Sequence, residues 1–289
     1  MIVRSIFLLA LLVALFVLGS AAKCHPPDTR VVVFLQGLYT NYQSDGTQGT
    51  ALEEHRFDTL KAAFLANGYD ETELLDFSYA GGSVDSDGNW RPLPYPCALT
   101  DRHSDVALGK LEQMLMSYKQ AHPEAHFALV GHSLGGYLAF LEGVRETARP
   151  DDAKLDVHVV VTLDSPLQGA SADKKVILDQ VPCQKTFQAG GELVTQKADP
   201  ATPDLRSVQA LAMAEQGIRL ATFGNDNDCL WRTARCIGGD WVDDGATQYV
   251  VGAALTASYD VVSGPLESHD AILAHPPAVA DAAAFVGAP

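Results

Sequence analysis

The chain has 289 residues, of which 47% are hydrophobic and 19% charged, and its formal net charge is −16 at pH 7. So acidic a surface disfavours nucleic acid and anionic membranes as partners, and no run of basic residues offsets it. The length suits one globular domain with a large core rather than a string of modules.

The first 22 residues have the pattern of a secretory signal peptide. Arg4 precedes the thirteen apolar residues 6–18, and small residues end at Ala22. A helix of that length spans only about 20 Å, which is short of a bilayer core. We therefore expect cleavage after Ala22 and a secreted, periplasmic or extracellular protein, with an uncleaved N-terminal anchor as the alternative. Losing Arg4 changes the net charge from −16 to −17.

Strands and helices alternate along the rest of the chain. Apolar, β-branched runs predict buried strands, and apolar residues at helical spacing predict helices. The expected order is strand 30–35, helix 52–67, strand 74–79, a long loop 81–100, helix 101–121, strand 126–130, helix 134–147, strand 157–163, a region 165–215 with two or three helical pieces, strands 218–223 and 259–262, and a terminal helix 277–285.

Three of these helices have predicted inner faces. The residues expected there are Leu52, Phe57, Leu60, Phe64 and Leu65 in the first helix, Val106, Leu108, Leu111, Leu115 and Tyr118 in the second, and Val279, Ala283 and Val286 in the last. Strands that alternate with helices predict an α/β fold, a mostly parallel sheet covered on both faces, in one domain over residues 23–289. Reactive groups in such folds gather at the carboxyl ends of the strands.

Five cysteines remain after the leader, and export makes disulfides feasible. We expect Cys229 to pair with Cys236 and, less firmly, Cys97 with Cys183, which leaves Cys24 over. The cysteine and histidine spacing matches no zinc motif, so no metal or cofactor is expected. The segment 85–89 (DSDGN) is interpreted as a solvated turn because a calcium loop needs further ligands.

The segment Gly131-His132-Ser133-Leu134-Gly135 contains G-x-S-x-G, the nucleophile elbow. Such an elbow is a tight strand-to-helix turn that exposes a serine hydroxyl at its tip. Glycines two residues before and after the serine keep side chains out of the turn. A strand precedes the motif here and a helix follows it, which separates it from a chance match and favours a nucleophilic serine over an ordinary surface one.

Four segments in order resemble the lipase and esterase branch of the α/β-hydrolase superfamily. They are 33–38 (VFLQGL), 131–136 (GHSLGG), 164–169 (DSPLQG) and 268–273 (SHDAIL). The resemblance implies Ser133 as nucleophile and His269, just after the last strand, as its base. His275 is the nearest competitor, and His132 is expected to point away from the site.

The acid of the triad has three candidates. The resemblance favours Asp228, which follows the strand before last and precedes an apolar pair. Asp164, at the end of the strand after the elbow helix, and Asp226, in the same loop as Asp228, remain alternatives because each could orient an imidazole.

Acyl transfer also needs donors for the oxyanion. The resemblance implies the backbone N–H groups of Leu134 and Leu38. Where family members commonly have His-Gly, this chain has Gln36-Gly37, so the side-chain support of that loop differs.

Residues 165–215 lie where this fold accepts a cap or lid. Their apolar side chains could line an acyl cleft or simply pack under an insertion; they are Leu167, Val176, Ile177, Leu178, Val181, Phe187, Leu193 and Val194. We expect a serine hydrolase that cleaves small-molecule or lipid acyl esters without a cofactor and can contact a lipid interface transiently. The alternatives are an acyltransferase and a non-catalytic binding domain on the same scaffold.

Overall fold

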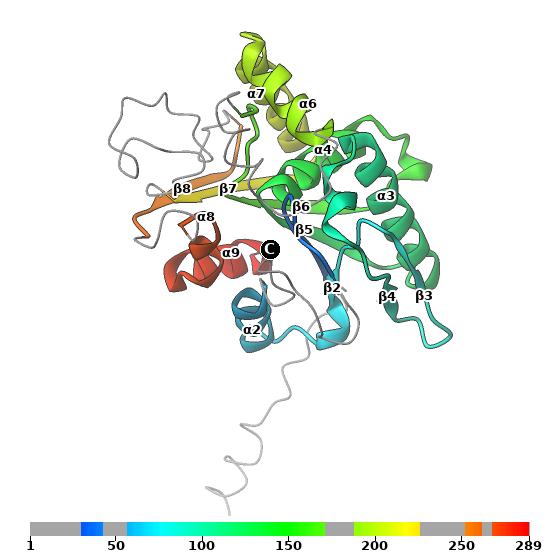
Figure 1. The fold of residues 1–289 in the computed structure, drawn as a ribbon. Coiled ribbons are helices and arrows are strands. Elements are labelled where there is room, and N and C mark those ends of the chain that lie inside the picture. The colour runs from blue at the N-terminus through cyan, green and yellow to red at the C-terminus, as the bar shows by residue number, and fades with distance from the viewer. Residues whose placement is uncertain (1–29, 43–56, 171–187, 226–251, 262–267, 289) are drawn as a thin grey trace, which may run out of the picture.

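The protein is built around one parallel sheet (Figure 1). The computed structural model describes residues 30–42, 57–170, 188–225, 252–261 and 268–288. The strand order is β2-β1-β5-β6-β7-β8, and every neighbouring pair is parallel. The strands are β1 (Arg30–Leu35), β2 (Leu74–Asp76), β5 (His126–His132), β6 (Val157–Leu163), β7 (Arg219–Asn225) and β8 (Leu255–Tyr259).

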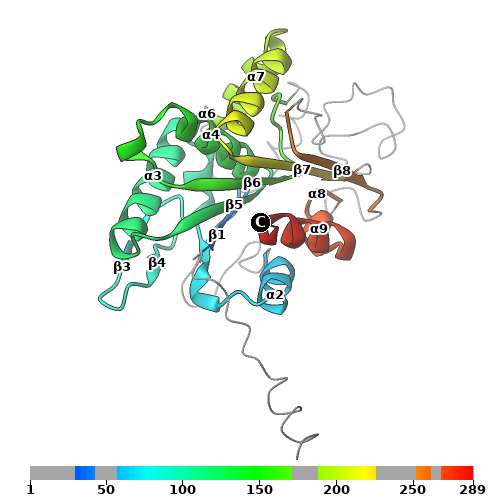
Figure 2. The ribbon, with the colours of Figure 1, turned by 180° about the vertical axis from the view of Figure 1, so that it is seen from behind.

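Helices cover both faces of the sheet, as Figures 1 and 2 show from opposite sides, and the α/β architecture expected from the alternating pattern is confirmed. One face carries α2 (Asp58–Ala66) and α9 (Pro276–Gly287). The other carries α3 (Ser104–Ala121), α4 (Leu134–Ala148), α6 (Gln188–Ala198) and α7 (Thr202–Glu215).

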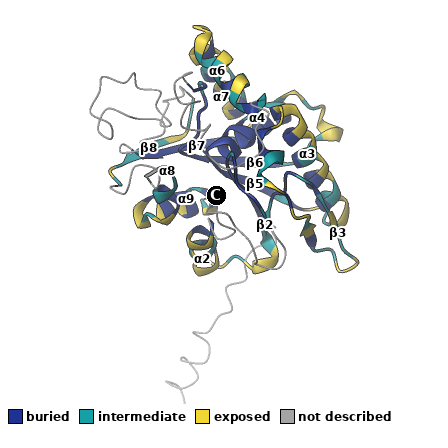
Figure 3. Cartoon of the chain, in the orientation of Figure 1, coloured by how far each residue is buried: buried dark blue, intermediate teal, exposed yellow. Residues whose placement is uncertain are grey.

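The central strands are buried on both faces, which is why their sequences are mostly apolar (Figure 3). Along β1, Val32 and Phe34 pack with the α2 and α9 residues, whereas Val31, Val33 and Leu35 pack on the α3 and α4 side. The side chains of successive strand residues thus alternate between two separate cores.

The short elements at the edges differ from the prediction. Residues 81–100, expected as a long loop, contain the antiparallel hairpin β3 (Gly82–Val84) and β4 (Trp90–Pro92) and the 3₁₀ turn η2 (Cys97–Asp101). Strands of three residues are too short to show a periodic pattern. The turn between β3 and β4 holds residues 85–89, where Asp85 accepts hydrogen bonds from the N–H groups of Asp87 and Asn89.

Two further boundaries were wrong. The strand β8 covers Leu255–Tyr259 rather than residues 259–262, because this half-exposed edge strand lacks the continuous apolar run of the central strands. The helix α3 begins at Ser104 rather than at residue 101. Two apolar residues placed on inner faces are exposed instead: Val106 is 44% and Leu65 39% exposed.

The remaining short elements are η1 (Glu71–Glu73), η3 (Asp151–Ala153), α8 (Ser268–Ala271) and η4 (Ile272–Ala274). The terminal helix α9 is present and buries Val279, Ala283 and Val286, as predicted. Within the described ranges, no helix has both the length and the apolarity needed to cross a bilayer.

Several predictions fall on residues that the structure does not describe. The leader over residues 1–22, Leu52 and the four cysteines Cys24, Cys183, Cys229 and Cys236 are among them. The cleavage site and both cysteine pairings therefore stay predictions.

Candidate active site

Ser133 occupies a strained turn between β5 and α4. Its backbone has φ 56° and ψ −128°. Residues other than glycine rarely adopt this conformation, which costs about 1–3 kcal/mol. A Cβ atom on Gly131 would lie 2.4 Å from the Gly135 carbonyl carbon, and one on Gly135 would lie 2.1 Å from the Leu35 oxygen. The two glycines of the motif are thus required sterically, and the turn has the geometry that the motif predicts.

The neighbouring strands fix the position of Ser133. Its N–H donates to the carbonyl oxygen of Leu163 on β6 at 2.9 Å. The residue is only 5% exposed. A Cβ atom added to Gly37 would lie 2.7 Å from Ser133 Cβ and 3.2 Å from Ser133 Oγ. The hydroxyl therefore lies against the loop that follows β1, where the sequence predicts an oxyanion donor.

That loop is held by one local and two long-range hydrogen bonds. The Tyr79 hydroxyl donates to the Gln36 carbonyl at 2.7 Å, and Thr40 Oγ1 donates to the Gly37 carbonyl at 2.8 Å. Burial raises the pKa of Tyr79 well above its ordinary value, so the phenol stays protonated and remains a donor. Thr100 Oγ1 accepts from the Tyr39 N–H at 2.7 Å. The hydroxyl groups of Tyr79, Thr40 and Thr100 thus hold the backbone of the loop at residues 36–39, where the sequence alone did not show what would support it.

The two N–H groups predicted as oxyanion donors have no acceptor among the described residues. The Gly37 carbonyl oxygen accepts a hydrogen bond from Thr40. In a planar trans peptide, the N–H of Leu38 points in the opposite direction from that carbonyl. No acceptor for the Leu38 N–H is found among the described residues. Leu134 is the first residue of α4, and a helix cannot satisfy the N–H groups of its first turn internally. Both amides are therefore available for a ligand oxygen.

Gly37 provides a test of this arrangement. We expect Gly37→Ala to lower kcat/KM for a p-nitrophenyl ester by about 100-fold or more, the cost typical of losing one oxyanion donor. The added methyl group would press on the Ser133 side chain and displace the loop. Gly109→Ala is the matched control, since a Cβ atom there meets nothing within 4 Å. Steady-state rates of both variants beside wild type check this, and equal rates would contradict it.

His269 lies in α8 and is 7% exposed. Its backbone carbonyl accepts a hydrogen bond from Nε2 of His132 at 2.9 Å, and the two imidazole centroids are 4.5 Å apart. Because His132 directly precedes Ser133, this bond fastens the segment that carries His269 to the elbow itself. The competitor His275 instead occupies the N-cap position of α9 without a side-chain capping bond, and its ring lies 5.5 Å from that of Tyr259.

His132 makes a contact that the sequence prediction did not identify. It was expected only to point away from the site, yet its side chain is fully buried and holds the His269 backbone. A carbonyl oxygen can only accept, so Nε2 of His132 carries the proton in this bond. The motif gives no signal for this role, since it depends on a residue 137 positions away.

Of the three candidate acids, the structure describes only Asp164. The carboxylate is fully buried, its Oδ1 accepts from the Asn225 N–H at 2.6 Å, and the residue has φ 44°. Asn225 in turn bonds both backbone groups of Val261, through Oδ1 at 3.0 Å and Nδ2 at 3.2 Å. Asp164 and Asn225 thus tie together the ends of β6, β7 and β8. Asp226 and Asp228 lie outside the described residues.

The described parts of the region 165–215 pack against the α4 side of the sheet. Leu167 and Leu193 are buried in that core, and Val194 is half-buried. The buried guanidinium of Arg206, on α7, donates to the Leu167 carbonyl at 2.7 Å and to the Tyr137 hydroxyl on α4 at 3.3 Å. Residues 171–187, with the other predicted cleft residues, are not described.

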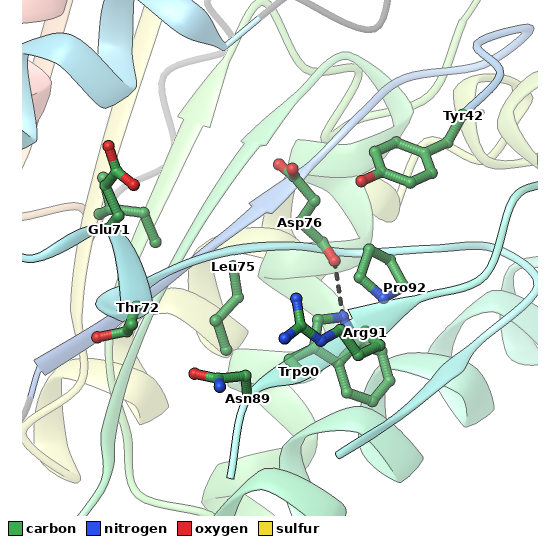
Figure 4. A pocket seen from close by; sticks show the side chains of 10 residues that line it. Tyr42, Glu71, Thr72, Leu75, Asp76, Asn89, Trp90, Arg91 and Pro92 are labelled. Atoms are coloured by element: carbon green, nitrogen blue, oxygen red, sulfur yellow. Dashed lines mark hydrogen bonds between the residues drawn. The ribbon is translucent and has the colours of Figure 1, made fainter. Parts of the chain in front are cut away.

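A separate hollow of about 640 Å³ lies along the edge strand β2, between that strand and the β3–β4 hairpin (Figure 4). Its lining includes Tyr42, Asp76 and Trp90, and the Trp90 Nε1–H donates to the Asp76 carbonyl at 2.9 Å. Neither Ser133 nor His269 lines it, so this hollow is distinct from the candidate site.

The chain was compared with known proteins in three ways. No family model matches the sequence, and no curated protein matches it either. Solved structures with a similar fold include a lipase-esterase related protein from Clostridium acetobutylicum, with 12% identity, a TM-score of 0.47 and coverage of 90% of this chain and 95% of that one. A metagenomic carboxyl esterase has 12% identity, a TM-score of 0.49 and coverage of 90% and 76%.

Phospholipase PlaB from Legionella pneumophila is also similar, with 11% identity and a TM-score of 0.44 over 68% of this chain. The chain spans only 37% of the length of that phospholipase. All three similarities are distant, with identities of 11–12% and TM-scores below 0.5.

Proposed function

We propose that the protein is a serine hydrolase that cleaves carboxylic esters and acts after export from the cell. The observation that carries the proposal is the elbow: Ser133 stands at a strained turn, and the His269 segment is hydrogen-bonded to the residue beside it. Strain of this kind persists only where the surrounding structure enforces it, and it gathers at functional sites.

The reaction follows from the roles of these groups. His269 takes the proton of the Ser133 hydroxyl while Oγ attacks the ester carbonyl carbon. The N–H groups of Leu38 and Leu134 stabilise the negative charge that develops on the carbonyl oxygen. The alcohol leaves with the proton from His269, and the acyl group stays on Ser133. Water, deprotonated by His269, then attacks the acyl-enzyme and releases the acid.

Asp228 completes the proposed triad by orienting the His269 imidazole. The described environment of Asp164 supports this division of roles, since Asp164 binds the backbone of Asn225, the last residue of β7 before the loop that contains Asp226 and Asp228. Asp164 would then position the acid loop rather than contact the base.

Three substitutions distinguish the candidate acids. We expect Asp228→Asn to lower kcat by about 10⁴-fold, as for other triad acids, because the imidazole loses its orienting partner. Asp164→Asn keeps an oxygen that can accept the Asn225 N–H, and it should cost less than about 10²-fold, as should Asp226→Asn. A larger loss in Asp164→Asn than in Asp228→Asn, with both variants folded by circular dichroism, would assign the acid to the end of β6.

The ester specificity is tested with p-nitrophenyl esters from acetate to palmitate. We expect wild type to hydrolyse part of this series and to release the free acid, with Ser133→Ala slower by about 10⁶-fold on every member that wild type cleaves. Product analysis with an added alcohol detects transfer to an acceptor other than water. Absence of turnover on all members, by folded protein, would argue against an ester hydrolase.

A further inference from the structure

Three side chains with metal-binding atoms meet at the amino ends of β5 and β6. They are His126, Asp156 and His158, and one ligand atom of each lies within 4.8 Å of the others. His126 is the first residue of β5 and Ser133 follows its last, so the cluster lies roughly 20 Å from the elbow. We propose that this cluster binds a divalent transition-metal ion of the Zn²⁺ class, at a site distinct from the candidate active site.

The two histidines lie beside a β-bulge. Phe127 pairs with Val157, but the next residue, Ala128, pairs with Val159, so His158 is an extra residue on β6. In this arrangement, His126 Nδ1 lies 3.1 Å from His158 Nε2.

This spacing suits a shared ion. Two nitrogen ligands on a tetrahedral Zn²⁺ lie roughly 3.3 Å apart, given metal–nitrogen distances of about 2.0–2.1 Å. The two imidazoles therefore need only a small adjustment to bind one ion. Imidazole nitrogens with one carboxylate favour Zn²⁺, Co²⁺, Ni²⁺ or Cu²⁺, whereas Mg²⁺ and Ca²⁺ prefer oxygen ligands alone.

The backbone of the third proposed ligand, Asp156, is held by the buried carboxylate of Glu146. Asp156 has φ 60°, and its N–H and that of Leu155 both donate to the carboxylate of Glu146, which is 2% exposed. Glu146 is itself paired with Arg149. These bonds fix the backbone that carries the Asp156 side chain.

Without a metal ion, Lys119 supplies the positive charge beside Asp156. Its ammonium group bonds the Asp156 carboxylate and also the carbonyl oxygens of Pro123 and Ala125. A metal ion would compete with Lys119 for that carboxylate. Arg30, on β1 beside His126, directs its guanidinium to the Val286 and Ala288 carbonyls at the end of α9.

The test is a titration of the chelator-treated mature protein with ZnCl₂ by calorimetry, repeated with CoCl₂ by visible absorption. We expect one site in wild type, and affinity lower by about 100-fold or more in His126→Gln and in His158→Gln. Lys119→Gln should bind more tightly than wild type, because the competing ammonium group is gone. His103→Gln, which removes an exposed histidine on η2–α3 paired with Glu192, is the matched control and should bind as wild type does.

His269→Ala is titrated in parallel, so that zinc bound at the candidate active site is counted separately. Added ZnCl₂ should raise the melting temperature of wild type and of His269→Ala but not that of His158→Gln. Affinity within threefold of wild type in both His126→Gln and His158→Gln, with melting curves that show folded protein, would overturn the proposal. So would the absence of any heat or absorption change in wild type.

Discussion

Ser133→Ala is expected to lower kcat/KM for the preferred p-nitrophenyl ester by about 10⁶-fold, the loss typical of removing a triad serine. The variant loses the atom that bonds to the acyl group, while the oxyanion donors of Leu38 and Leu134 remain. The residual rate should therefore stay above that of the ester in water. Initial rates at several substrate concentrations measure the change.

A nearby serine provides the control. Ser165 is buried at the end of β6, and its Oγ donates to the Leu163 carbonyl at 3.1 Å, the carbonyl that also accepts from the Ser133 N–H. Ser165→Ala should change kcat/KM by less than about tenfold, since only a structural hydrogen bond is lost. A loss of similar size in both variants would mean that the region, and not the Ser133 hydroxyl, limits the reaction.

His269→Ala has the second largest expected effect, again about 10⁶-fold in kcat, because serine and base act as one unit. The substitution keeps the backbone carbonyl that accepts from His132, so the segment should remain attached to the elbow. A loss of activity would then reflect the missing imidazole rather than a displaced segment.

His275→Ala is the matched control for the base. It removes the other histidine of the same region, which the sequence offered as a competitor. We expect its kcat to remain within about tenfold of wild type, as for a substitution away from the reacting groups. A larger loss in His275→Ala than in His269→Ala would transfer the role of base to His275.

The central part of the fold could be predicted from the sequence because strands buried on both faces have a recognisable apolar composition. The strands around Val31–Leu35 and Val157–Leu163 are rich in β-branched and other apolar residues, a composition typical of strands buried on both faces. The elbow could also be predicted, because a side chain at either glycine of the motif would clash with the backbone nearby. The positions of Ser133 and of α4 followed from those two signals.

The edges of the molecule could not be predicted in the same way. The β3–β4 hairpin has strands of three residues, and β8 is half-exposed, so neither has a pattern long enough to recognise. Val106 was misplaced because a helical face is some 100° wide, and a residue at its margin can lie on either side.

The support of the candidate site was also beyond prediction. The bond from Tyr79 to Gln36 joins residues 43 positions apart, and the bond from His132 to His269 joins residues 137 positions apart. Such contacts depend on how the strands are ordered in the sheet, which a single sequence does not record. A motif therefore locates a reacting group more readily than the residues that hold it in place.

The most direct measurement is covalent labelling of the folded protein with a fluorophosphonate, followed by peptide mass spectrometry. The account predicts one label per molecule, on Ser133, and labelling slowed by orders of magnitude in His269→Ala while His275→Ala reacts as wild type does. Labelling of a different residue, or equal labelling of Ser133 in wild type and His269→Ala, would contradict the claim that the serine at this elbow is activated by that histidine.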